Sequence, residues 1–108
     1  MRVPICEEGR TVMALFIVKH QHSAEKCPAG DPQIAPMLAQ HVSKAGAQPF
    51  GVEIHGEGVV DGGHTLYLIV DAPDQQTVSE YMTPFGQMGS VEVLPASSCE
   101  QVVARASC

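Results

Sequence analysis

Positive charge is scarce in this sequence, and the basic residues are scattered along it. The 108 residues contain six Lys and Arg against twelve Asp and Glu, which gives a formal charge of −6 at pH 7. A surface that binds nucleic acid needs basic side chains gathered on one face to neutralise phosphates. Because no stripe of that kind is present, we expect nucleic acid not to be a partner.

Long apolar runs are also missing. The longest run, Val12–Val18, is much shorter than the roughly 20 residues that span a bilayer, so no membrane partner is expected. The first ten residues include Glu7 and Glu8 and lack the apolar segment of a secretory signal. A cytoplasmic location is therefore expected, and there the cysteines Cys6, Cys27, Cys99 and Cys108 would normally stay reduced.

Several catalytic signatures are absent as well. The chain has no G-x-S-x-G elbow, no P-loop, no G-x-G-x-x-G and no paired C-x-x-C motifs. Acyl transfer by a serine nucleophile and P-loop nucleotide hydrolysis therefore have no support in the sequence.

The composition that is present suits one small domain. Hydrophobic residues make up 44% of the chain and charged residues 17%, enough apolar material for a single core at this length. Residues 1–12 show no periodicity, and Met13 is a plausible translation start. We therefore predict a leader or extension over residues 1–12 and one α+β domain over residues 13–108.

Within that domain, apolar periodicity predicts the element order β-α-β-β-α-β followed by a short helix. The expected strands are 13–22, 50–60, 64–70 and 90–94, with a hairpin turn at 61–63. The expected helices run from about residue 36 to a stop at Gly46, from Pro73 to Phe85, and from a Ser97 cap paired with Glu100. This order is the split βαβ pattern of ferredoxin-like domains, in which four antiparallel strands carry both helices on one face.

The first and third strands are apolar on both faces, as in Ala14–Val18 and Thr65–Val70, which a sheet open to water on one side does not require. In element order and in these strands the sequence resembles small members of the dimeric α+β-barrel superfamily. The resemblance covers Met13–Leu94 and implies a homodimer, or a higher homo-oligomer, with two sheets packed face to face. It implies no particular activity, since such barrels include cofactor-free monooxygenases, isomerases, haem enzymes and ligand-binding modules.

The most informative stretch is His20-Gln-His22 followed by Cys27. Residues two apart in a strand share a face, so two imidazoles can point together while the next loop returns a thiolate to them. Zinc, copper and iron all accept imidazole with thiolate, and His55 or Glu53 can supply a fourth ligand. The alternative is that both histidines are solvated residues at a strand end and that Cys27 packs as a small hydrophobic residue.

Two further places can carry chemistry. Glu53, His55 and Glu57 are expected on one face of the second strand, where His55 is either a general base or an ordinary residue of an edge strand. Cys99 is expected in the first turn of the last helix, where the helix dipole favours a reactive, redox-active thiol. His64, beside the hairpin, is expected to be a solvated turn residue.

Three functions follow as hypotheses. The first is a homodimeric protein that binds a transition metal through His20, His22 and Cys27, with His55 as an addition. The second is a metal-free barrel enzyme that holds a small apolar molecule between two sheets, with His55 or Tyr67 moving a proton. The third is a ligand-binding or regulatory module that performs no chemistry.

Overall fold

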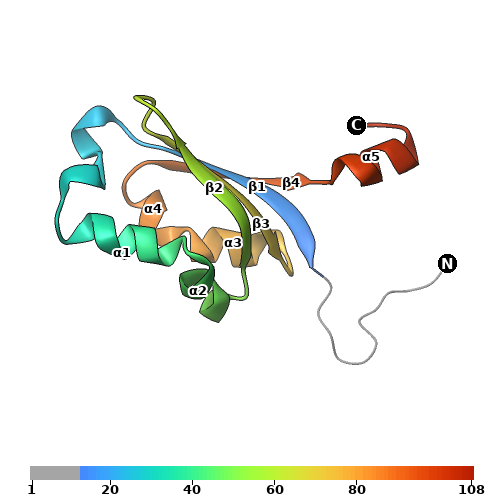
Figure 1. Cartoon of the computed structure of the whole chain (residues 1–108), viewed down its shortest axis with the longest axis horizontal. Coiled ribbons are helices and arrows are strands. Elements are labelled where there is room, and N and C mark those ends of the chain that lie inside the picture. Colours follow the sequence, from blue (N-terminus) through green and yellow to red (C-terminus); the bar gives the residue numbers. More distant parts are fainter. Residues whose placement is uncertain (1–12) are drawn as a thin grey trace.

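The computed structural model describes residues 13–108, and the expected leader at 1–12 lies outside the described residues. Four antiparallel strands form one sheet in the order β2-β3-β1-β4, with the helical segments α1 to α4 on one side (Figure 1). The strands are β1 (Ala14–Gln21), β2 (Glu53–Val60), β3 (Thr65–Ala72) and β4 (Ser90–Ala96). The helices are α1 (Ile34–His41), α2 (Lys44–Ala47), α3 (Gln75–Tyr81), α4 (Thr83–Gly86) and α5 (Cys99–Arg105). The α+β prediction with ferredoxin-like strand order is confirmed.

The core lies between the sheet and the helices. Alternate residues of β1 and β3 face the helices, and Val18, Leu68 and Val70 are completely buried there. The intervening residues face the other way. On that open face Ile17, Tyr67, Ile69 and Leu94 are 36 to 48% exposed, so the structure of one chain leaves the second apolar face of the sheet uncovered.

The α3 helix begins at Gln75, two residues later than the predicted start at Pro73. Asp74 is its N-cap rather than a first-turn residue, because the Asp74 carboxylate accepts a hydrogen bond of 2.8 Å from the Thr77 backbone N–H. Capping of this kind satisfies a backbone donor that has no partner within the helix. The helix ends at Tyr81, and α4 follows with Pro84 in its first turn.

The first helical stretch is divided into α1 and α2. We expected one helix up to Gly46, but α1 ends at His41 and Ser43 caps the short α2. Gly46 lies inside α2, and a Cβ there would collide with the Gln40 carbonyl group. This glycine therefore permits the close approach of two helices and does not mark a helix stop.

The last helix, α5, extends from the end of β4 away from the rest of the domain (Figure 1). Its capping box uses Ser98 and Gln101, not the predicted Ser97 and Glu100. The cap moves by one residue because β4 continues to Ala96. None of the helices within residues 13–108 is long and apolar enough to cross a membrane.

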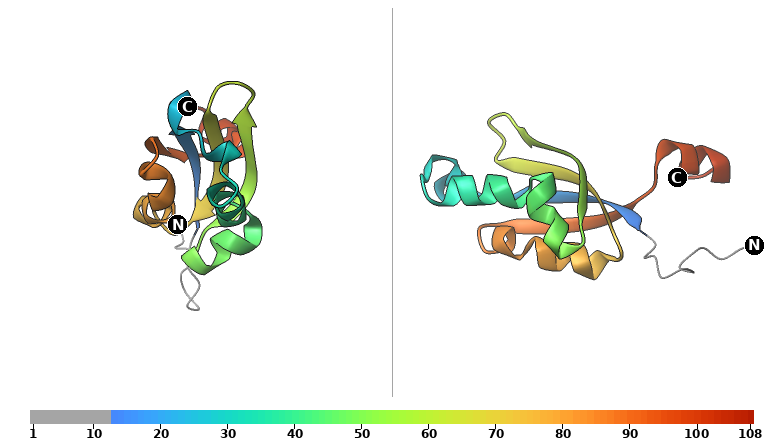
Figure 2. Two further views of the ribbon diagram at one scale, coloured as in Figure 1. Left: turned by 90° about the vertical axis from the view of Figure 1, so that its left-hand side faces the viewer. Right: turned by 60° about the horizontal axis from the view of Figure 1, so that its bottom comes forward.

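Two helical rows lie side by side over the sheet, α1 with α2 and α3 with α4 (Figure 2). The second row buries Val78, Tyr81 and Phe85 against the sheet. In contrast, α1 has no buried side chain. The space between α1 and the sheet is where the candidate site lies.

Candidate functional site

A cavity of about 550 Å³ opens between α1 and the β2–β3 hairpin. Its walls are mainly apolar and come from Ala35, Leu38, Val42, Val59, Leu66 and Phe85. The polar groups in the lining are His20, His22, His64, Cys27 and Glu57. Cavities of this size with a few convergent polar groups are typical of small-molecule sites.

His20 and His22 do share one face of β1, as the strand period predicts, but they have different surroundings. His20 is only 2% exposed, with its ring 5.1 Å from that of Phe85. Its Nδ1 lies 3.1 Å from the Ser90 carbonyl oxygen, and its Nε2 lies 3.3 Å from Nδ1 of His22. Both nitrogens of His20 therefore have protein partners, which leaves neither free to bind a ligand.

This chain of contacts fixes the tautomers of both rings. The Ser90 carbonyl oxygen can only accept, so Nδ1 of His20 carries the hydrogen and Nε2 of a neutral His20 is an acceptor. Nδ1 of His22 must then donate to it. Nε2 of a neutral His22 is consequently left with a lone pair, and this buried atom has no hydrogen-bond partner among the described residues.

The surroundings favour the neutral form of both rings. Burial lowers the pKa of His20 below its ordinary 6.5, the hydrogen bond to Ser90 opposes this, and the nearby His22 adds to the lowering. Burial and the neighbouring His64 lower the pKa of His22. At neutral pH the unpartnered nitrogen of His22 is thus a base or a ligand, not a cation.

His64 is half-buried beside His22, although we expected a solvated turn residue. The His22 backbone N–H donates to the His64 carbonyl oxygen at 3.2 Å, and the ring centroids lie 5.3 Å apart. His64 has a φ of 51°, a left-handed conformation that is uncommon for residues other than glycine and that recurs at functional sites. Antiparallel pairing of Gln21 with Thr65 places the two histidines at the same end of the sheet.

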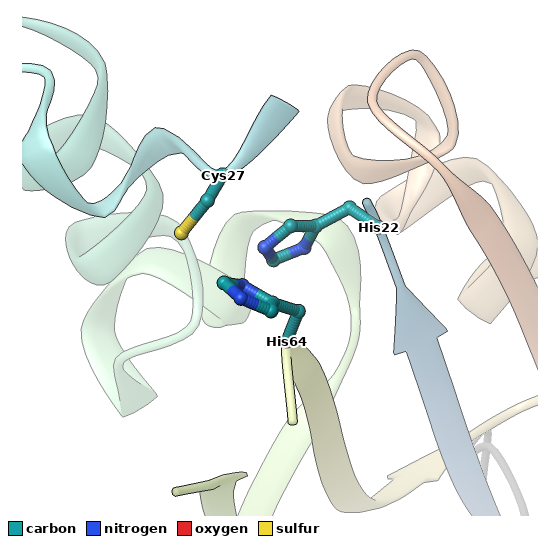
Figure 3. Close-up of side chains that lie close together, drawn as sticks. All are labelled: His22, Cys27 and His64. Carbon is teal, nitrogen blue, oxygen red and sulfur yellow. The ribbon is translucent and has the colours of Figure 1, made fainter. Parts of the chain in front are cut away.

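Cys27 completes the group from the loop between β1 and α1. Ligand atoms of His22, Cys27 and His64 all lie within 4.8 Å of one another, and the three side chains point toward a common centre (Figure 3). The structure therefore brings together two of the predicted ligands, His22 and Cys27. The third member of the group is His64, whereas the sequence predicts His20 in that place and His55 as an additional ligand.

Glu57 reaches the cavity because of an irregularity in β2. The register between β2 and β3 shifts between Ile54 and Gly56, which places Glu57 opposite the buried Leu68 on the helical side of the sheet. The expectation that Glu53, His55 and Glu57 share one face is therefore wrong. A bulge of this kind adds one residue and reverses the alternation beyond it.

His55 belongs to a second group with Glu53 and Asp71. Its Nε2 lies 2.9 Å from a carboxylate oxygen of Asp71, and the side chain is 45% exposed. Tyr67 faces the open side of the sheet and is 41% exposed. Neither His55 nor Tyr67 lines the cavity beside α1, so the proton-moving residues of the metal-free hypothesis are not part of this site.

Cys99 is the first residue of α5, as expected, and is exposed. It belongs to no ligand group within residues 13–108. The structure therefore gives Cys99 no partner in the candidate site.

One protein family matches the chain, the family described as Domain of unknown function (DUF3303), over residues 15–107. Neither a curated protein nor a solved structure matches the chain. The match includes all of the sheet except Ala14, the helices of the described residues and every residue of the candidate site.

Proposed function

The chain belongs to the DUF3303 family, whose description names no activity, and from the geometry of the site we propose that it binds one transition-metal ion through His22, Cys27 and His64. The observation that carries this proposal is Nε2 of His22, a buried nitrogen that has no hydrogen-bond partner within residues 13–108. An unpaired buried polar atom costs about 1 to 3 kcal/mol. Coordination of an ion would remove that cost.

His22 shares one feature with metal-binding histidines, a second ring nitrogen held by a neighbour, although the neighbour here is an imidazole and not the usual carboxylate, backbone carbonyl or water. A ligating imidazole donates its other N–H to a neighbouring acceptor, which fixes the ring orientation and its tautomer. Here that acceptor is His20, which is itself held by the Ser90 carbonyl oxygen. His20 is therefore assigned the role of positioning His22 and not of a ligand.

The donor set favours zinc over harder ions. Two imidazoles and one thiolate suit zinc, copper or iron, and three protein ligands leave a fourth tetrahedral position open. Tetrahedral zinc holds such ligand atoms about 3.3 to 3.6 Å apart, so the group, now within 4.8 Å, would close by about 1 Å around the ion. A bound zinc would supply a Lewis acid at one end of the cavity. The thiolate requires a reduced Cys27 and hence a reducing compartment such as the cytoplasm.

Metal content per chain tests the proposal. Untagged protein purified without chelators should contain about one metal ion per chain by plasma mass spectrometry. His22→Ala, Cys27→Ser and His64→Ala should each lose it, whereas His20→Ala should retain binding with an affinity about 10-fold to 100-fold weaker. The matched control is His55→Ala, an exposed histidine outside the cavity. Unchanged uptake in a Cys27→Ser, His64→Ala double variant would remove the proposal.

We further propose that the open face of the sheet pairs with a second copy of the chain. Four large apolar side chains lie on it, and sheets with such faces are normally covered on both sides. Ile69→Lys, on that face, should convert a dimer into monomers by light scattering. Met37→Lys on α1, where Met37 is 69% exposed on the helical side, should leave the dimer intact. A monomeric wild-type protein would contradict this proposal.

A further inference from the structure

The cavity beside His22, Cys27 and His64 has a lining that restricts which molecules it could bind, and this inference rests on the proposed metal site. We propose that the cavity binds a small monoanion with an apolar body. Its anionic head would occupy the open metal position, and its body would lie between α1 and the β2–β3 hairpin.

The net charge of the metal ion with its three protein ligands determines the head group that the ligand would carry. Two neutral imidazoles and one thiolate leave a divalent ion with one net positive charge, which an anion would neutralise. No Lys or Arg lines the cavity within the described residues. The metal is therefore the one cationic partner that this part of the structure offers to an anionic head.

The apolar walls of the cavity favour an apolar body for the ligand. Ala35, Leu38 and Val42 of the α1 side face Val59 and Leu66 of the hairpin side across the cavity. Burial of apolar surface against such walls strengthens binding about fourfold for each methylene group. A volume of about 550 Å³ leaves room for a chain of several carbons or for a ring.

The carboxylate of Glu57 disfavours a ligand that carries more than one negative charge. The bulge in β2 turns this carboxylate to the helical side of the sheet, where it lines the same cavity. A second anionic group on the ligand would meet the charge of Glu57, and none of the described residues that line the cavity is basic and could offset it. Dianions of the same length should therefore bind more weakly than monoanions.

Cobalt-substituted protein provides the test, since tetrahedral cobalt with a thiolate ligand absorbs visible light and responds to a change in the fourth ligand. Butanoate, hexanoate and octanoate would be titrated, with octanedioate as the matched dianion. Affinity should rise at least tenfold from butanoate to octanoate, and octanedioate should bind at least tenfold more weakly than octanoate. Glu57→Gln should reduce the difference in affinity between octanoate and octanedioate.

Two variants separate the cavity from the metal. Ala35→Leu narrows the cavity and should weaken the dependence of affinity on chain length while the cobalt spectrum persists. Ala45→Leu, at an exposed position of α2 outside the cavity, should leave the dependence of affinity on chain length unchanged. A normal cobalt spectrum with equal affinity for all chain lengths would overturn this proposal and leave the metal site standing. Absence of the thiolate-cobalt absorption would overturn both the proposed metal site and the proposed binding of an anion in the cavity.

Discussion

The two helical rows cover the same sheet in different ways. The row of α3 and α4 buries Val78, Tyr81 and Phe85 against it. The row that begins with α1 buries no side chain of that helix and leaves a cavity of about 550 Å³ instead. One half of the layer thus supplies most of the packing, and the other half supplies the space in which the histidines and Cys27 meet.

Since α1 has little packing of its own, it is positioned from the other row. Nε2 of His41 donates to the Tyr81 carbonyl oxygen at 2.7 Å, and the Tyr81 hydroxyl donates to the His41 carbonyl oxygen at 2.5 Å. The two rings also stack, with centroids 4.5 Å apart. This reciprocal pair ties the end of α1 to the end of α3, so the tightly packed row holds the wall of the cavity.

The largest expected difference between the rows is in the effect of truncating a methionine. Met82, between α3 and α4, is 1% exposed, whereas Met37 on α1 is 69% exposed. Met82→Ala should lower the free energy of unfolding by about 2 to 5 kcal/mol because it leaves a cavity in the core. Met37→Ala should change it by less than about 0.5 kcal/mol. Denaturant titration measures both, and equal losses would contradict the comparison.

Enlarging a side chain sharpens the same contrast. Ala72 is completely buried in the core, so Ala72→Leu should destabilise the fold by about 1 to 3 kcal/mol through overpacking. Ala35 lines the cavity, so Ala35→Leu has free space to occupy and should cost less than about 1 kcal/mol. A larger loss from Ala35→Leu than from Ala72→Leu would show that α1 packs more tightly than the structure indicates.

A smaller effect is expected at the link between the rows. Tyr81→Phe removes one hydrogen bond to His41 and should cost about 1 to 2 kcal/mol, whereas Tyr67→Phe on the open face should cost little. Burial raises the pKa of Tyr81 from 10.0 to about 12. The contribution of Tyr81 is therefore complete below pH 10 and is lost as pH rises toward 12. The stability difference between wild type and Tyr81→Phe should shrink over that range, and a constant difference would contradict the assignment.

The sequence predicts the strands because runs of apolar and β-branched residues are a local signal, and it predicts their order in the sheet because the element order matches the ferredoxin-like pattern. It also predicted His22 and Cys27 as neighbours. His64 was missed, although pairing of the first and third strands would have placed the residue after Gln21 beside the residue before Thr65. The predicted topology contains this signal, but the position of His64 next to a hairpin turn favours a solvated residue when the turn is considered alone.

Other features could not be read from local patterns. The alternation in β2 reverses at a bulge, and Gly56 alone is a weak sign of one. Ser97 and Ser98 both have a capping partner three residues on, so only the observed end of β4 decides between them. Nδ1 of His20 is occupied by a hydrogen bond to Ser90, 70 residues away. No spacing along the chain reveals this contact.

The metal group is the central claim, and X-ray absorption at the zinc edge tests its ligands most directly. Zinc-loaded protein should show one sulfur at about 2.3 Å and nitrogen or oxygen ligands at about 2.0 to 2.1 Å, with two imidazoles in the outer-shell scattering. In Cys27→Ser protein the sulfur contribution should vanish. Zinc bound by nitrogen and oxygen alone in the wild-type protein would contradict a site built from His22, Cys27 and His64.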